Sequence, residues 1–213
     1  RPTTTRANYP PSRWPPASAE MEATRRAPGR PRSLEADEAI LEAAVDVFAE
    51  VGLEALTMEG VAARAGVGKN TLYRRYPNKL DLVVSAVRCY TNVGAPPPDT
   101  GSTRGDLQAV VDDLVAIVTD TPMGRMLPTL VAARARAPEL DVAYAEIVAD
   151  KRARSSAVVR RGIERGDLRA DADVEAVVDC LVSPIFYRFL VTHAPLDESF
   201  RTGVVDSVLR AFS

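Results

Sequence analysis

Apolar residues along most of this 213-residue chain recur three and four positions apart, which is the spacing of an amphipathic helix. No segment shows the strict alternation of apolar and polar residues that indicates a half-buried strand. The pattern therefore predicts an all-α fold of about nine helices. Four short to medium helices are expected between residues 35 and 92, and the remaining helices are expected at 107–118, 126–131, 138–166, 173–193 and 197–212.

Proline-rich segments divide the chain. Residues 1–33 are rich in Pro and Arg and are predicted to be a disordered basic arm, with Met21 as an alternative start. The run Gly94-Ala95-Pro96-Pro97-Pro98-Asp99 separates two helical halves. We therefore expect one domain at 34–92 and a second at 93–213.

Composition limits the possible functions. The chain has a net charge of −2 and no apolar run of about 18 residues, so a cytoplasmic protein without a membrane span is expected. Cys89 and Cys180 have no metal-type spacing and are expected to be buried thiols. With a single histidine, His193, no catalytic constellation is found, so an enzyme is not favoured, and no cofactor or metal is predicted. The pair Asp112-Asp113 is interpreted as solvated surface.

One segment of the chain, residues 60–80, contains basic side chains but no acidic ones. Between Gly60 and Leu80 there are five basic residues and no acidic one, which favours contact with a polyanion. Thr57 can cap a short helix that ends near residue 65, and Gly66 can form a tight turn. A second short helix is then expected over residues 68–75. This arrangement is a helix-turn-helix, whose second helix enters a DNA major groove.

The segment around this window resembles the DNA-binding domain of the tetracycline-repressor (TetR) family. The resemblance is carried by A-x-x-x-F-A-E-x-G at 44–52, T-x-x-x-V-A at 57–62 and A-G-V-x-x-x-T-L-Y-x-x-Y-x-N-K-x-x-L at 65–82. It implies that Leu72 and Tyr76 hold the recognition helix in its core. Where many members carry Ser or Pro, this chain has Gly68 and Asn70, so the base sequence that it reads stays open. The DNA-contact set implied by the resemblance is Thr57, Lys69, Asn70, Thr71, Tyr73, Arg74, Arg75 and Lys79.

Individual side chains of that set suit different contacts. Lys69, Asn70, Thr71 and Arg74 are types that read base edges, whereas Tyr73 and Lys79 suit phosphates. For Arg75, a structural role is as well supported as a DNA contact. Arg30 and Arg32 lie in Pro-Gly-Arg-Pro-Arg, which resembles an AT-hook that enters the minor groove, with non-specific phosphate contact as the alternative. An architectural DNA protein driven by this arm is a rival interpretation.

By the same resemblance, residues 93–213 bind a small-molecule effector and form a homodimer through the last two helices, so that two recognition helices meet a pseudopalindromic operator. The helix that starts at Asn78 would link ligand binding to DNA binding, as in a ligand-responsive repressor. The apolar seam of the dimer is expected at Val177, Val178, Leu181, Ile185, Leu190, Val204, Val205, Val208 and Leu209. Candidate ligand contacts, for which a plain core role is the alternative, are Met126, Leu130, Tyr144, Phe186, Tyr187 and Phe189.

Overall fold

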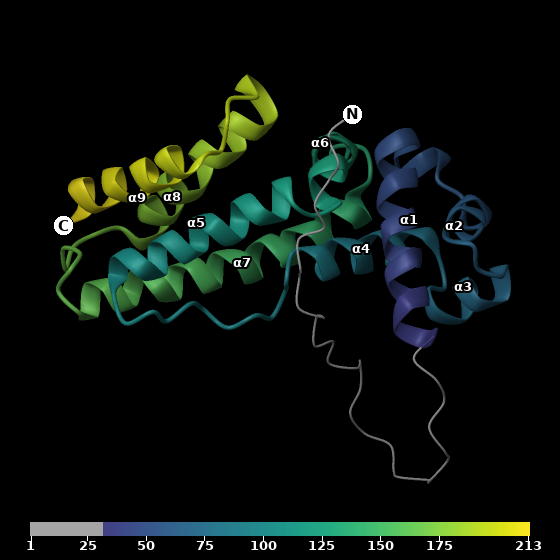
Figure 1. The fold of residues 1–213 in the computed structure, drawn as a ribbon, viewed down its shortest axis with the longest axis horizontal. Coiled ribbons are helices and arrows are strands. Elements are labelled where there is room, and N and C mark those ends of the chain that lie inside the picture. Colours follow the sequence, from purple (N-terminus) through teal and green to yellow (C-terminus); the bar gives the residue numbers. More distant parts are fainter. Residues whose placement is uncertain (1–31) are drawn as a thin grey trace, which may run out of the picture.

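A computed structural model describes residues 32–213 of the chain, with side chains from residue 35 onward. The molecule is elongated, with α2 and α3 at one end and the α8–α9 pair toward the other (Figure 1). Helices are the only regular elements within the described range, which confirms the predicted all-α class. They are α1 (Arg32–Ala55), α2 (Met58–Ala65), α3 (Lys69–Arg75), α4 (Lys79–Tyr90), α5 (Thr103–Thr119), α6 (Met123–Arg134), α7 (Pro138–Glu164), α8 (Val174–Tyr187), the π-helical segment η1 (Arg188–Thr192) and α9 (Glu198–Phe212).

Local signals set the boundaries of the first four helices as the sequence predicts. The Thr57 side chain accepts a hydrogen bond from the Gly60 backbone N–H at 3.1 Å, and the Asn78 side chain accepts one from Asp81 at 2.9 Å. These caps satisfy amides that have no partner within the helix. Gly66 adopts a left-handed φ of 67°, which lets the chain turn sharply from α2 into α3.

Several boundaries differ from the prediction, including those of α5 and α6, which are longer than the expected 107–118 and 126–131. The first helix is predicted from Glu35, but α1 begins at Arg32, and Gly52 interrupts it with a φ of 73° before a last turn. The helix predicted at 173–193 is α-helical only to Tyr187 and then widens into η1. It stops at His193, which is exposed and has a left-handed φ of 54°. Helix ends of this kind depend on local backbone geometry that periodicity does not encode.

Two apolar cores hold the helices together, and the first one crosses the predicted division at residues 92 and 93. Phe48 of α1 and Leu72 of α3 share that core with Met126 and Leu130 of α6. The second core joins α5, α7, α8 and α9. Side chains from both sides of residue 93 are packed together in this core. The division into domains at 34–92 and 93–213 therefore stays a prediction.

The second core also contains most of the predicted dimer seam. Val177, Leu181 and Val205 are fully buried inside the single chain, and Val178, Ile185, Val204 and Val208 accompany them. Val177, Val178, Leu181, Ile185 and Val205 are covered within the chain, so the predicted seam is wrong for them, whereas Val204 and Val208 also line a groove between α8 and α9. They are buried because α8 and α9 pack on α5 and α7 within the same chain. The prediction of two buried thiols is also wrong, since Cys89 is half-buried and Cys180 is exposed.

A buried carboxylate fastens the segment before α5 to the end of α7. Asp106 is fully buried and accepts hydrogen bonds from the Thr100 backbone N–H at 2.6 Å and from Arg161 and Arg165 at 2.9 Å each. Burial alone would raise the pKa of Asp106, but these hydrogen bonds outweigh it and lower the pKa to about 2. The ionised carboxylate therefore stabilises the folded chain.

We predict that Asp106→Asn lowers the free energy of unfolding by about 2 kcal/mol at pH 7, because two guanidinium groups lose their buried partner. The pKa of Asp106 lies below its ordinary value of 3.8, so this stabilisation is present above about pH 4 and is lost as the pH falls toward about 2. The difference between variant and parent should shrink over that range. Urea denaturation at several pH values measures it.

Asp99→Asn is the matched control, because Asp99 also accepts a hydrogen bond from Arg165 but its side chain is 63% exposed. An exposed pair contributes less than about 1 kcal/mol. Equal losses of stability in the two variants would contradict the role assigned to the buried carboxylate.

Candidate DNA-binding surface and ligand cavity

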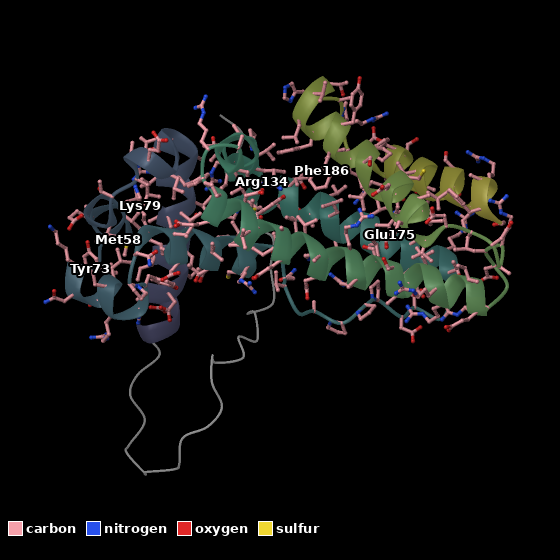
Figure 2. The ribbon with its side chains drawn as sticks, turned by 180° about the vertical axis from the view of Figure 1, so that it is seen from behind. Met58, Tyr73, Lys79, Arg134, Glu175 and Phe186 are labelled. Carbon is pink, nitrogen blue, oxygen red and sulfur yellow. The ribbon has the colours of Figure 1, made fainter. Side chains whose placement is uncertain are left out.

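The second helix of the helix-turn-helix, α3, presents a polar face at one end of the molecule. Lys69, Asn70, Tyr73 and Arg74 are exposed, and Thr71 is half-buried. Leu72 is fully buried on the opposite side of the helix and holds it against the first core, as predicted. Figure 2 shows the Tyr73 side chain at this end, well away from the cavity residue Phe186. The exposed side chains are the ones that can meet base edges and phosphates.

Folding brings carboxylates from outside the basic window onto its cations. Glu50 of α1 forms an ion pair with Arg64 at 2.8 Å, and Glu59 of α2 lies 3.5 Å from the Lys69 Nζ. The Tyr73 hydroxyl donates a hydrogen bond to the same Glu59 at 3.5 Å. The pKa of Glu59 is lowered, first by a hydrogen bond from its own backbone and then by the charge of Lys69. Two predicted DNA contacts are thus engaged by one carboxylate in the free protein.

The other basic residues of this region divide between structural and exposed positions. Arg75 pairs with Asp37 of α1 at 2.5 Å and its side chain is only 20% exposed, which favours the structural of its two possible roles. The Lys79 Nζ donates to the Glu54 backbone carbonyl at 2.9 Å. Burial raises the pKa of the half-buried Tyr76 to about 12, in keeping with its predicted core position. The side chains of Arg30 and Arg32 lie outside the described residues.

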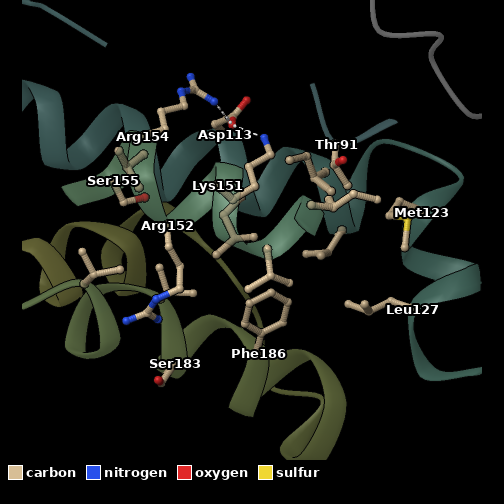
Figure 3. Close-up of a pocket in the computed structure, with 18 of the residues that line it drawn as sticks. Thr91, Asp113, Met123, Leu127, Lys151, Arg152, Arg154, Ser155, Ser183 and Phe186 are labelled. Atoms are coloured by element: carbon tan, nitrogen blue, oxygen red, sulfur yellow. Dashed lines mark hydrogen bonds and ion pairs between the residues drawn. The ribbon is translucent and has the colours of Figure 1, made fainter. Parts of the chain in front are cut away.

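A cavity of about 310 Å³ lies between the end of α4 and helices α5, α6, α7 and α8 (Figure 3). Two of the six predicted ligand contacts, Tyr144 and Phe186, line it. Met126 and Leu130 are instead fully buried in the first core. Met123 and Leu127, one turn apart on α6, belong to the same core but also line the cavity.

Tyr187 and Phe189, the other two candidate ligand contacts, also lie outside the cavity wall. Tyr187 follows Phe186 on α8 but points outward and is 59% exposed. Phe189 is half-buried and packs against the first core. The prediction of ligand contacts is therefore wrong for Met126, Leu130, Tyr187 and Phe189 as far as the cavity walls are concerned.

Charged side chains form one part of the cavity wall. Asp113 accepts a hydrogen bond from Arg154 at 2.8 Å and lies 3.6 Å from the Lys151 Nζ. Arg152 pairs with Glu175 at 2.5 Å and with Asp179 at 2.6 Å. The interpretation of Asp112-Asp113 as solvated surface is wrong for Asp113, whose side chain is 23% exposed. Sequence reasoning missed these charged residues, because the basic run on α7 follows a pattern typical of a solvated helix face.

Within residues 32–213, no helix is long and apolar enough to cross a membrane. The same part of the chain holds no group of three or more His, Cys, Asp or Glu side chains placed to bind a metal ion.

Fold and surface together define a helix-turn-helix DNA-binding regulator of transcription with a second helical region behind it. Comparison with known proteins identifies the family. A model described as bacterial regulatory proteins, tetR family, matches residues 40–86, and a model of the tetracyclin repressor-like C-terminal domain matches residues 97–208. The chain therefore belongs to the TetR family.

Similar proteins extend over most of the chain. YdeS of Bacillus subtilis (strain 168), described as an uncharacterized HTH-type transcriptional regulator, is 32% identical over 86% of this chain and 91% of its own length. The HTH-type transcriptional regulator AqdR of Rhodococcus erythropolis is 30% identical over 75% of this chain and 76% of its own. The crystal structure of the TetR family transcription regulator SCO0332 is 33% identical, has a TM-score of 0.60 and covers 83% of this chain and 97% of that one.

We predict that Glu59→Gln tightens non-specific DNA binding about threefold, because an exposed carboxylate no longer competes with phosphate for Lys69. The slope of log affinity against log salt should steepen by up to about 0.9, since Lys69 then neutralises a phosphate with its full charge. Fluorescence anisotropy with random-sequence duplexes at several salt concentrations measures both effects.

Glu164→Gln makes the same charge change at an exposed position near the end of α7, far from α3 in the fold. It should leave DNA affinity and salt slope unaltered. If Glu59→Gln bound no more tightly than this control, the carboxylate would not be competing with DNA.

Proposed function

We propose that this chain acts in the cytoplasm as a ligand-responsive repressor, binding a pseudopalindromic operator as a homodimer. The observation that carries the proposal is the position of α6, which forms the cavity wall with one face and packs on α1 with the other. The exposed polar face of α3 supplies the DNA contacts, and the cavity supplies a place for an effector. Family membership supports both parts.

The outer faces of α8 and α9 form the surface that we assign to the dimer. A groove between them is lined by short side chains such as Cys180, Gly203 and Ser207 and by the larger side chains of Phe200 and Phe212. Nearby, Tyr187 is 59% exposed and Val191 is 62% exposed. Exposed apolar side chains beside a shallow groove are typical of a surface that a partner covers. This outer surface takes the place of the buried seam predicted from the sequence.

Helix α6 offers a route from the cavity to the DNA-binding surface. Leu127 lines the cavity, and one turn further on Leu130 packs in the core that it shares with α1. The contact is fastened by an ion pair from Arg125 to Asp46 at 2.6 Å. A ligand that displaces α6 would therefore move α1, and α3 packs in the same core.

Helix α4 provides a second route, as predicted from the sequence. Thr91, at its end, lines the cavity, and Arg88 pairs with Glu146 of α7 at 3.1 Å. A ligand that favours the conformation in which the two recognition helices of the dimer are wrongly spaced must weaken operator binding. By linkage, the operator weakens ligand binding by the same factor.

We predict that selection of bound duplexes from a random DNA pool yields an inverted repeat whose half-sites are centred about 34–36 Å apart, one helical turn. The preference should persist after deletion of residues 1–31, because α3 and not the basic arm reads the bases. Enrichment of A·T-rich DNA without a repeat, or loss of all preference on deletion, would instead support the architectural alternative.

We predict that Gly203→Glu converts the dimer to a monomer and weakens binding to the full inverted repeat by at least about tenfold, because one monomer engages a single half-site. Sedimentation velocity and gel shifts measure the two effects. A Cβ atom added at Gly203 meets no atom within 4 Å, so the fold of the single chain should tolerate the substitution.

Thr202→Glu is the matched control, since Thr202 is exposed on α9 but does not line the groove. It should remain dimeric. A dimeric Gly203→Glu variant would contradict the assignment of this face.

A further inference from the structure

Lys151 lines the cavity, but its ammonium group is directed at Asp113 behind the cavity wall and has an incomplete set of partners there. Its Nζ atom is buried and forms no hydrogen bond to any described residue. The nearest carboxylate oxygen, Oδ2 of Asp113, is 3.6 Å away, which is longer than a hydrogen bond. Figure 3 shows Lys151 and Arg154 directed at Asp113 from two sides. A buried ammonium group without hydrogen bonds is costly and is relieved by an anion placed beside it.

The charges around the cavity do not cancel at this point. Arg152 is compensated by two carboxylates, Glu175 and Asp179. Lys151 and Arg154, in contrast, share the single carboxylate of Asp113, and Arg154 takes the shorter contact of 2.8 Å. Burial lowers the pKa of Lys151, with the charge of Arg154 acting in the same direction and Asp113 and Asp150 opposing it. The charges are thus unevenly distributed, with two carboxylates on Arg152 and a single carboxylate shared by Lys151 and Arg154.

The rest of the cavity wall is apolar, and the volume of the cavity limits the size of the ligand. Val118, Met123, Leu127, Ile147 and Phe186 line the side away from the charges. The volume of about 310 Å³ is about twice that of an apolar cavity of ~150 Å³ that holds one benzene ring. A compact hydrophobic body of about two rings, or a chain of similar volume, matches this space.

From these contacts we infer that the effector is a small hydrophobic carboxylate whose apolar body fills the space in front of Phe186 and whose acid group pairs with Lys151 when the ammonium group turns from Asp113 into the cavity. The inference rests on the proposed effector cavity and names the chemistry of its ligand. Asp113 and Asp179 do not favour a cationic ligand, because each is already paired with an arginine.

The test uses ligands matched in shape but not in charge. We would titrate the full chain with 2-naphthoate and with 2-naphthylmethanol, and with decanoate and decan-1-ol, by isothermal titration calorimetry at pH 7.5. We expect at least one acid to bind about tenfold or more tightly than its alcohol, a difference of ~1.4 kcal/mol. The bound acid should also weaken binding to the selected operator.

Variants then locate the charge that is responsible. Lys151→Met should remove the preference for the acid and leave the binding of the alcohol unchanged or tighter, whereas Lys151→Arg should keep the preference. Arg160→Met is the control, because it removes one positive charge from an exposed position on the same helix, away from the cavity wall. The comparison of acid with alcohol on the unaltered chain needs no variant to fold.

Each other outcome has a distinct meaning. Equal binding of acid and alcohol, or an acid preference that survives in Lys151→Met, would overturn the carboxylate inference and leave the cavity as an effector site. If none of the four compounds bound, the carboxylate inference and the cavity assignment would both be overturned. Operator selection by the same preparation would show whether the DNA-binding part of the proposed function still holds.

Discussion

The packing of α6 against α1 is the contact on which the arrangement of this molecule depends. Met126 and Leu130 are almost fully buried in a core that also holds Phe48 and Leu72. Burial of side chains of this size contributes about 1.5–3 kcal/mol each. The same helix turns Met123 and Leu127 toward the cavity. Because protein cores are close-packed, we expect a displacement of α6 at the cavity to shift the helix-turn-helix as well.

Ion pairs between helices set the charge of each site once packing has brought the helices together. On the DNA-binding surface, Glu59 and Glu50 hold basic side chains that the sequence shows in an acid-free window. At the far end of α7, Asp106 gathers Arg161 and Arg165, which the local sequence presents as solvated. Beside the cavity, Asp113 lies 2.8 Å from Arg154 but 3.6 Å from Lys151, so the ammonium group of Lys151 has the weaker ion pair. In each case the partner comes from a different helix, so the balance of charge is a property of the fold.

Elements with strong local signals were predicted well. The caps at Thr57 and Asn78, the turn at Gly66 and the buried Leu72 depend on residues within a few positions of each other. Of the predicted ligand contacts, Tyr144 and Phe186 line the cavity and the others do not, and much of the predicted dimer seam is covered within the chain, because periodicity shows that a helix has an apolar face but not what covers it. Val177 and Leu181 pack inside the chain, while Tyr187 faces outward from the same helix.

By itself the sequence determined the helical class, the helix-turn-helix and the polar face of the recognition helix with Lys69, Asn70 and Arg74, since these follow from spacing, capping and side-chain type. Only the tertiary structure decided that Arg75 ties α3 to α1, that Glu59 engages Lys69, and that Lys151 lies at a cavity wall. The physical reason is distance along the chain. Contacts between helices depend on how whole faces pack, and residues far apart in sequence then share one environment that no local pattern records.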